Sequence, residues 1–267
     1  MLWKSLIGLF AVFFVLIVGG GAVRAATAYS IENQNDELVT IDLGSGVVTV
    51  VGSLGFDADN IDLTMVNGHL YGLDIHYPTS QTLYEIDTVT GSMVSSVSLT
   101  PTAPDSEALS HEGEQLVMAH YSGVASIVAD LALGGELSNP LTGGNDIDGL
   151  GVNANGDLYA LDWTHEINLY ELSLSTATYS TSLLATRASG PANDLVIYED
   201  NIYIAAYNAA SLSEELVVYD LTTSSFSTKT LSTSGRYFGL ALVPEPSTAL
   251  LLGIGLAGMT AVRRRTR

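Results

Sequence analysis

The chain has no cysteine among its 267 residues, so disulfide bonds, zinc–thiolate sites and thiol nucleophiles are excluded. Basic residues are also scarce: there are nine, and six of them lie near the two ends. Residues 27–243 hold 28 acidic residues against three basic ones, a net charge of −25. Such a surface repels phosphate backbones, so nucleic acid is not expected as a partner. Either the acids form a solvated surface or some of them bind metal cations.

Motifs of common catalytic sites are absent as well. The sequence contains no Gly-x-Ser-x-Gly elbow, no His-Glu-x-x-His pair and no Walker loop. No stretch of residues 27–243 shows sustained helical periodicity, and this excludes a helical domain there. The chain is therefore expected to be all-β and is not expected to be an enzyme of a common catalytic class.

The first 26 residues have the pattern of a secretory signal peptide. Lys4 gives a basic start, residues 6–18 are apolar, and small residues follow up to Ala26. This order is typical of a leader that the Sec translocon accepts and that is later removed. We predict that residues 1–26 are a signal peptide, with an uncleaved N-terminal anchor as the alternative.

Residues 244–267 form a separate C-terminal segment. It opens with Pro244-Glu245-Pro246, and two prolines stop any regular element because each fixes φ and lacks an N–H donor. An apolar run of roughly 15 residues follows, somewhat shorter than the roughly 20 that a full membrane span needs. We predict a hydrophobic helix here, held at its cytoplasmic end by a membrane-stop cluster of Arg263, Arg264 and Arg265.

These three parts, in this order at the C-terminus, resemble the PEP-CTERM sorting signal of Gram-negative bacteria. The resemblance implies that an exosortase recognises Pro244, Glu245 and Pro246 and processes the tail. It also implies anchoring in the inner membrane during sorting, followed by transfer to the cell surface or extracellular matrix. Since such proteins usually come from species that form biofilm, extracellular polysaccharide is implied as a partner. A plain membrane anchor is the alternative.

The region between these ends repeats with a step of 42 to 46 residues. Its clearest mark is Leu-Tyr-Gly-Leu-Asp at residues 70–74, which returns as Leu-Tyr-Ala-Leu-Asp at 158–162. Aligning the copies puts five residues in one column: Tyr29, Tyr71, Val117, Tyr159 and Tyr203. A second apolar segment follows in each copy, at residues 38–42, 83–87, 126–130, 169–173 and 216–220. A β-branched segment closes most copies, at 47–51, 93–99, 178–183 and 225–231.

Short runs rich in Val, Ile, Tyr and Thr, bounded by Gly, Asn, Asp and Ser, predict strands and turns. Four strands in a unit of about 43 residues are typical of a β-propeller blade. The first unit lacks an innermost strand, and a spare one stands at residues 238–242. We therefore predict that residues 27–243 form a β-propeller of about five blades, closed by the C-terminal strand. Six blades, a β-sandwich or an open β-solenoid are the alternatives.

Acidic residues precede the innermost strand of four units: Asp62, Glu107, Asp148 and Asp194. Innermost strands surround the axis of a propeller, so these four carboxylates are expected to form a ring at one mouth of its channel. Oxygen ligands alone favour a hard cation, above all Ca²⁺. The alternative is that the acids accept hydrogen bonds from backbone amides of neighbouring blades. The five histidines fall at different positions of the repeat and are interpreted as packing or surface residues.

The phrases "GDLYALD" and "LYEIDTVTGSMV" are similar to those of extracellular YVTN, NHL and gluconolactonase-like propellers. Gluconolactonase-like members hold a channel metal with Glu, Asn and Asp at strand starts, and residues 105–109 and 193–195 look similar to these. The Asn-Gly-Leu segment of that family is missing. The favoured function is a non-enzymatic binding module on an exported protein, and the alternative is a metal-dependent hydrolase or lactonase-like enzyme.

Overall fold

The computed structural model describes residues 26–58, 61–76, 80–99, 106–120, 123–127, 137–142, 147–163, 166–174, 179–188, 190–208 and 213–244. Every regular element in these ranges is a β-strand, which confirms the all-β class. None of these residues belongs to a helix that is long and apolar enough to cross a membrane. The predicted signal peptide, apart from Ala26, and the predicted C-terminal helix lie outside the described residues.

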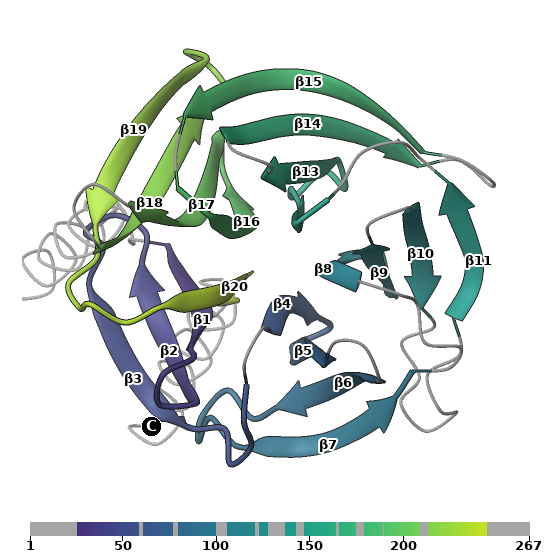
Figure 1. Cartoon of the computed structure of the whole chain (residues 1–267), viewed down its shortest axis with the longest axis vertical. Helices are drawn as coiled ribbons and strands as arrows, with labels where there is room; N and C mark the ends of the chain where they lie inside the picture. Colours follow the sequence, from purple (N-terminus) through teal and green to yellow (C-terminus); the bar gives the residue numbers. More distant parts are fainter. Residues whose placement is uncertain are drawn as a thin grey trace, which may run out of the picture.

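The described strands form five four-stranded antiparallel sheets, arranged around a central axis as in a β-propeller (Figure 1). Four of these sheets, numbered 2 to 5 in chain order, have their strands in chain order from the axis to the rim. Sheet 2 contains β4 (Ile61–Val66), β5 (His69–His76), β6 (Ser80–Ile86) and β7 (Met93–Ser98). Sheet 3 contains β8 (Ser106–Glu112), β9 (Gln115–His120), β10 (Gly123–Ile127) and β11 (Leu137–Thr142). Sheet 4 contains β12 (Gly149–Val152), β13 (Leu158–Trp163), β14 (Glu166–Leu174) and β15 (Tyr179–Ala188). Sheet 5 contains β16 (Ala192–Tyr198), β17 (Asn201–Asn208), β18 (Ser213–Asp220) and β19 (Ser225–Thr230).

Sheet 1 is built from both ends of the domain. It contains β20 (Tyr237–Leu242), β1 (Thr27–Glu32), β2 (Glu37–Asp42) and β3 (Val48–Ser53), in that order from the axis. The last strand pairs antiparallel with the first, with Ala28 opposite Leu242 and Glu32 opposite Tyr237. The C-terminal strand therefore supplies the innermost position that the first repeat lacks, as the sequence predicted.

Five hydrophobic clusters hold the described sheets together, and each lies between two neighbouring sheets. The cluster around Tyr203, Leu216, Ala28 and Leu240 joins sheet 5 to sheet 1, so the series of interfaces closes on itself. Each innermost strand contributes one leucine that is at most 2% exposed and packs in the cluster shared with the preceding sheet. These five leucines are Leu63, Leu109, Leu150, Leu195 and Leu240.

The two faces of the ring differ, and they are named here by their strands. The upper face is the end where the innermost strands begin, at Ile61 in sheet 2 and Tyr237 in sheet 1. The lower face is the end where they finish, at Val66 and Leu242. In the hairpin turns between the third and fourth strands of a sheet, an aspartate accepts hydrogen bonds from the next backbone N–H groups, as Asp87 does from Val89 and Thr90. These Asx-type turns explain why so many of the repeats end a strand in Asp.

The structure corrects one predicted strand. The third unit was expected to have a strand at residues 126–130, whereas β10 covers Gly123–Ile127 and residues 128–130 lie outside the described residues. Leu116 of β9 pairs with Ile127, just as Leu70 pairs with Ile86 in sheet 2. A slip of two residues leaves the alternation of inward and outward side chains unchanged, so the hydrophobic pattern could not reveal it.

Candidate functional site

The mouth of the channel at the upper face contains two buried acids, Asp62 on β4 and Asp194 on β16. Asp62 is 3% exposed and Asp194 is 0% exposed. Each is the residue just before the buried leucine of its own innermost strand, Leu63 and Leu195. The same position holds Ala108, Gly149 and Gly239 in the other three sheets.

Both acids make the same hydrogen bonds. Oδ1 of Asp62 accepts from the N–H of Leu63 at 3.0 Å, and Oδ2 accepts from the N–H of Leu109 in sheet 3. Oδ1 of Asp194 accepts from the N–H of Leu195 at 2.6 Å, and Oδ2 accepts from the N–H of Leu240 in sheet 1. Each side chain thus joins its sheet to the next one around the ring.

The two carboxyl groups also contact each other. Burial raises the pKa of Asp62 to about 7, against the lowering effect of its hydrogen bonds to Asp194, Leu109 and Leu63. Burial, the charge of Asp62 and the contact between the two side chains raise the pKa of Asp194 well above its usual range. Two ionised carboxylates in contact away from water would repel strongly, so this pair is suited to holding a proton between its members.

Glycines at the equivalent position of sheets 1 and 4 allow the innermost strands to approach their neighbours closely. Gly239 has a φ of +64°, and a Cβ there would lie 2.9 Å from the backbone oxygen of Ile61 and 2.7 Å from Cγ of Leu63. On the other side, a Cβ on Gly149 would lie 2.9 Å from Cα of Asp194. The innermost strands are therefore packed backbone to backbone where the acids are absent.

The other two predicted ligands behave differently. Oδ2 of Asp148 accepts from the N–H of Trp163 in its own sheet, and its own N–H donates to the carbonyl of Leu161 at 2.8 Å. The backbone of Glu107 lies in β8, and its side chain is outside the described residues. Both stand two residues before their leucine rather than one. For Asp148, this one-residue difference directs the carboxylate to Trp163 of its own sheet.

The structure therefore brings Asp62 and Asp194 together and directs Asp148 to Trp163. In the part of the chain that the structure describes, no three His, Asp or Glu side chains are grouped so that they could hold a metal ion. The backbone hydrogen bonds of Asp62 and Asp194 agree with the structural role considered as the alternative. The four-acid cation site stays a prediction, since one of its members is not described.

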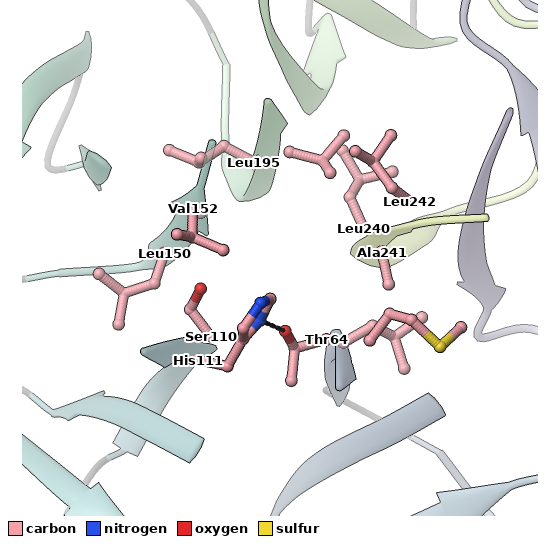
Figure 2. A pocket seen from close by; sticks show the side chains of 13 residues that line it. Thr64, Ser110, His111, Leu150, Val152, Leu195, Leu240, Ala241 and Leu242 are labelled. Atoms are coloured by element: carbon pink, nitrogen blue, oxygen red, sulfur yellow. Dashed lines mark hydrogen bonds between the residues drawn. The ribbon is translucent and has the colours of Figure 1, made fainter. Parts of the chain in front are cut away.

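Below the two acids the channel contains a small cavity of about 60 Å³ (Figure 2). Its polar wall comes from sheets 2 and 3 and its remaining wall is apolar. Nδ1 of His111 lies 3.1 Å from Oγ1 of Thr64, and Ser110 stands beside them. Burial lowers the pKa of His111, so its imidazole is neutral near pH 7. This volume holds a few water molecules, not a sugar ring.

His111 was interpreted as a packing residue, and the alignment of repeats gave no reason to single out Thr64 or Ser110. The signal was present but weak: in the column after the leucine, Thr64 and Ser110 stand where the other sheets have Gly151, Val196 and Ala241. The repeated tyrosines are confirmed as packing residues. Tyr29, Tyr71, Tyr159 and Tyr203 are each at most 9% exposed and belong to the clusters between sheets.

A second polar group lies between sheets 5 and 1 at the upper face. Glu214 on β18 is 3% exposed, and its Oε2 has no hydrogen-bond partner. Burial raises its pKa to about 7, although Arg236 lowers it. Tyr237 is also buried here, and burial together with the charges of Glu32 and Glu214 raises its pKa to about 12. The sequence did not single out Glu214, because an acid in a strand is usually on the solvent side.

Comparison with known proteins identifies the C-terminal segment. Residues 242–265 match the family described as the PEP-CTERM protein-sorting motif. No curated protein matches the chain. The matched residues include all of the predicted sorting residues, of which Pro244 is the last described one and is exposed.

Solved structures are similar to the β-sheet domain. A protein of unknown function from Bacteroides caccae is 10% identical, with a TM-score of 0.51 over 83% of this chain and 100% of its own. The PQQ-bound aldose sugar dehydrogenase of Streptomyces coelicolor is 9% identical, with a TM-score of 0.51 over 80% of each chain. At such identities the similarity shows the fold alone. The chain is therefore a β-propeller protein that carries a PEP-CTERM protein-sorting motif, as its sequence predicted.

Proposed function

We propose that this is an exported, exosortase-sorted protein of the cell surface or extracellular matrix, whose propeller is a non-enzymatic binding module. One observation carries the proposal: the sorting motif begins at residue 242, where the ring-closing strand β20 ends. The folded domain is thus complete before the sorting segment starts. An exosortase-type enzyme, the Sec translocon and, through the C-terminal helix, the inner membrane are the partners in sorting.

Three features support binding rather than catalysis. Both oxygens of Asp62 and of Asp194 accept backbone hydrogen bonds, so these acids hold the sheets together. The channel cavity of about 60 Å³ is too small for a sugar substrate. The net charge of −25 on residues 27–243 suits partners that carry cations or bind through them. Extracellular polysaccharide of a biofilm, bridged by divalent cations, is the ligand class that fits this surface and the sorting signal.

Sorting is tested by following the full chain in a Gram-negative host with and without its exosortase. The wild-type chain should leave the inner-membrane fraction only when the exosortase is present. The variant Glu245→Ala should stay in the inner membrane in both hosts, while Asp57→Ala, an exposed acid of the propeller, should behave as the wild type. Release of the Glu245→Ala variant at the wild-type level would contradict the proposal.

Binding is tested with polysaccharide isolated from the matrix of the same host. The released protein should sediment with the polymer in the presence of Ca²⁺ and lose most of this association when a chelator is added. If the protein does not sediment with the polymer either with Ca²⁺ or with the chelator, the proposed binding to polysaccharide is contradicted.

The second candidate is a metal-dependent hydrolase or lactonase-like enzyme with its site at Asp62, Glu107, Asp148 and Asp194. The observation in its favour is the contact between Asp62 and Asp194 at the channel mouth. A bound Ca²⁺ would raise the melting temperature, and Asp148→Asn would remove part of that increase. A melting temperature that does not respond to Ca²⁺ or to a chelator would contradict both the metal site and this enzyme.

We further propose that the five sheets are the full number of blades. The five interfaces already form a closed series, with the last cluster joining sheet 5 to sheet 1. A sixth blade would have to separate two sheets that this series brings into contact.

A further inference from the structure

Both ends of the propeller leave the ring at the same place on its lower face. The N–H of Val243 donates to the carbonyl of Thr27 at 2.8 Å, and the N–H of Leu43 donates to the carbonyl of Ala26 at 2.8 Å. The C-terminal segment therefore continues from the lower end of β20, which is the innermost strand of its sheet (Figure 1). It starts close to the ring axis rather than at the rim.

The connection from this point to the apolar segment is short. Pro244 is the last described residue, and the apolar run starts at Ala249. Five residues, 244–248, separate the ring from that run, and fully extended they reach about 17 Å. Two of the five are prolines, each of which has a fixed φ.

This reach excludes an orientation in which the upper face of the ring lies on the membrane. If the upper face were turned to the membrane, the connection would have to cross the width of sheet 1 and then pass up its side. Four strands with three spacings of about 4.8 Å span about 14 Å, and the six residues of β20 rise about 20 Å. The path of about 34 Å is roughly twice the length available.

We propose that in the membrane-anchored form the lower face lies against the membrane surface and the upper face is turned outward. This rests on the proposed function in one respect, the anchoring of the tail. The upper face, with the mouth at Asp62 and Asp194 and the buried Glu214, is then the surface that an extracellular partner reaches. The hairpin turns of the lower face are shielded until the tail is cut.

Charge does not produce this orientation. The described turns that follow the innermost strands contain acids, such as Glu114, Asp157 and Glu199, and contain no Lys or Arg. Anionic lipid headgroups repel such a face. The short connection therefore holds this face near the membrane against a repulsion that higher ionic strength weakens.

The absence of cysteine makes a direct test possible, because one introduced cysteine is the only thiol. Glu114→Cys places it in the exposed β8–β9 turn, at the lower end of the innermost strand β8, and Gln34→Cys places it in the exposed β1–β2 turn of the upper face. The full chain is incorporated into liposomes, and labelling by a maleimide attached to a bulky polymer is followed. Detergent-dissolved samples of the same variants give the reference rates.

The cysteine of Glu114→Cys should react several-fold more slowly in liposomes than in detergent, whereas the accessible fraction of Gln34→Cys should react at the same rate in both. Inserting about 20 Gly and Ser residues after Thr248 adds ~65 Å of reach and should remove the protection of position 114. Equal rates for both positions in liposomes, or protection that survives the insertion, would overturn the inference. A chain that does not enter the liposome fraction would instead refute the anchoring assumed in the proposed function, and the inference with it.

Discussion

Asp62 and Asp194 make the same pair of hydrogen bonds in two different sheets, and their carboxyl groups contact each other across the channel mouth. Each accepts from the N–H of the leucine in its own strand and from the N–H of the equivalent leucine in the next sheet. Asp194 in this way connects β16 to β20, the strand that closes the ring. One member of the buried acid pair is therefore hydrogen-bonded to the strand that closes the ring.

Replacing Asp194 by asparagine should destabilise the folded state by about 1–3 kcal/mol. Both of its oxygens accept from backbone N–H groups, so the amide nitrogen of asparagine would face a donor whichever way the side chain is turned. The change is measured by urea unfolding of the domain. Asp57→Asn, at an exposed upper-face position, is the matched control and should change the free energy of unfolding by less than about 0.5 kcal/mol.

Stability should also decrease as the pH rises from about 4 to about 7. The pKa of Asp62 is raised from 3.8 in the unfolded chain to about 7 in the folded one, so the folded state keeps a proton that the unfolded state releases in this range. Glu214 acts in the same direction, since its pKa rises from 4.5 to about 7. Each such proton contributes up to ~1.4 kcal/mol per pH unit, and the free energy of unfolding falls with increasing pH.

The measurement is the urea midpoint between pH 5 and pH 8, in salt high enough to screen the surface charge. Asp194→Asn removes one member of the buried pair and should flatten the pH dependence. Midpoints that rise with pH, or an unchanged slope in this variant, would show that the pair does not hold a proton in the folded state.

Gly239→Ala should destabilise the domain by about 2–4 kcal/mol. Alanine is strained at a φ of +64°, and its Cβ would also lie too close to Leu63 and Ile61. Gly68→Ala separates the two effects, because Gly68 has a φ of +84° and open space around it. That control should lose only about 1 kcal/mol. Similar losses for both variants would mean that close packing of β20 on β4 contributes little.

The ring should tolerate loss of the tail and not loss of β20. A chain ending at Val243 keeps the pairing of β20 with β1 and the hydrogen bond from the N–H of Leu240 to Asp194. A chain ending at Arg236 loses both and leaves a buried carboxylate without a partner. The first should resist limited proteolysis as the full domain does, and the second should be cut rapidly. Equal resistance of the two chains would contradict closure by the C-terminal strand.

Much of this fold could be predicted because the repeated segments of the chain can be aligned with one another. The Leu-Tyr columns place the second strand of each sheet, and the spare residues 238–242 reveal the closing strand. Sheet 3 is where prediction was weakest. A two-residue slip in β10 is invisible to an alternating pattern, and no fourth strand was predicted where β11 contains Pro140. That strand is at the outer edge of its sheet, a place where proline is tolerated.

The site was predicted only in part. The sequence shows acids near the strand starts, with Asp62 and Asp194 one residue before their leucine and Asp148 two before, but the prediction treated these positions as equivalent. For Asp148, that difference directs the carboxylate to Trp163 of its own sheet. The cavity with Thr64 and His111 and the buried Glu214 depend on contacts between sheets, which single-strand patterns do not contain.

The most direct test of the whole account is the C-terminal residue of the mature protein, determined by mass spectrometry after expression in a Gram-negative host that has an exosortase. The account predicts an end at or just after the Pro244-Glu245-Pro246 motif, with all of β20 (Tyr237–Leu242) retained, and an intact Arg267 when the exosortase is deleted. An intact Arg267 in both hosts, or an end before Leu242, would contradict it.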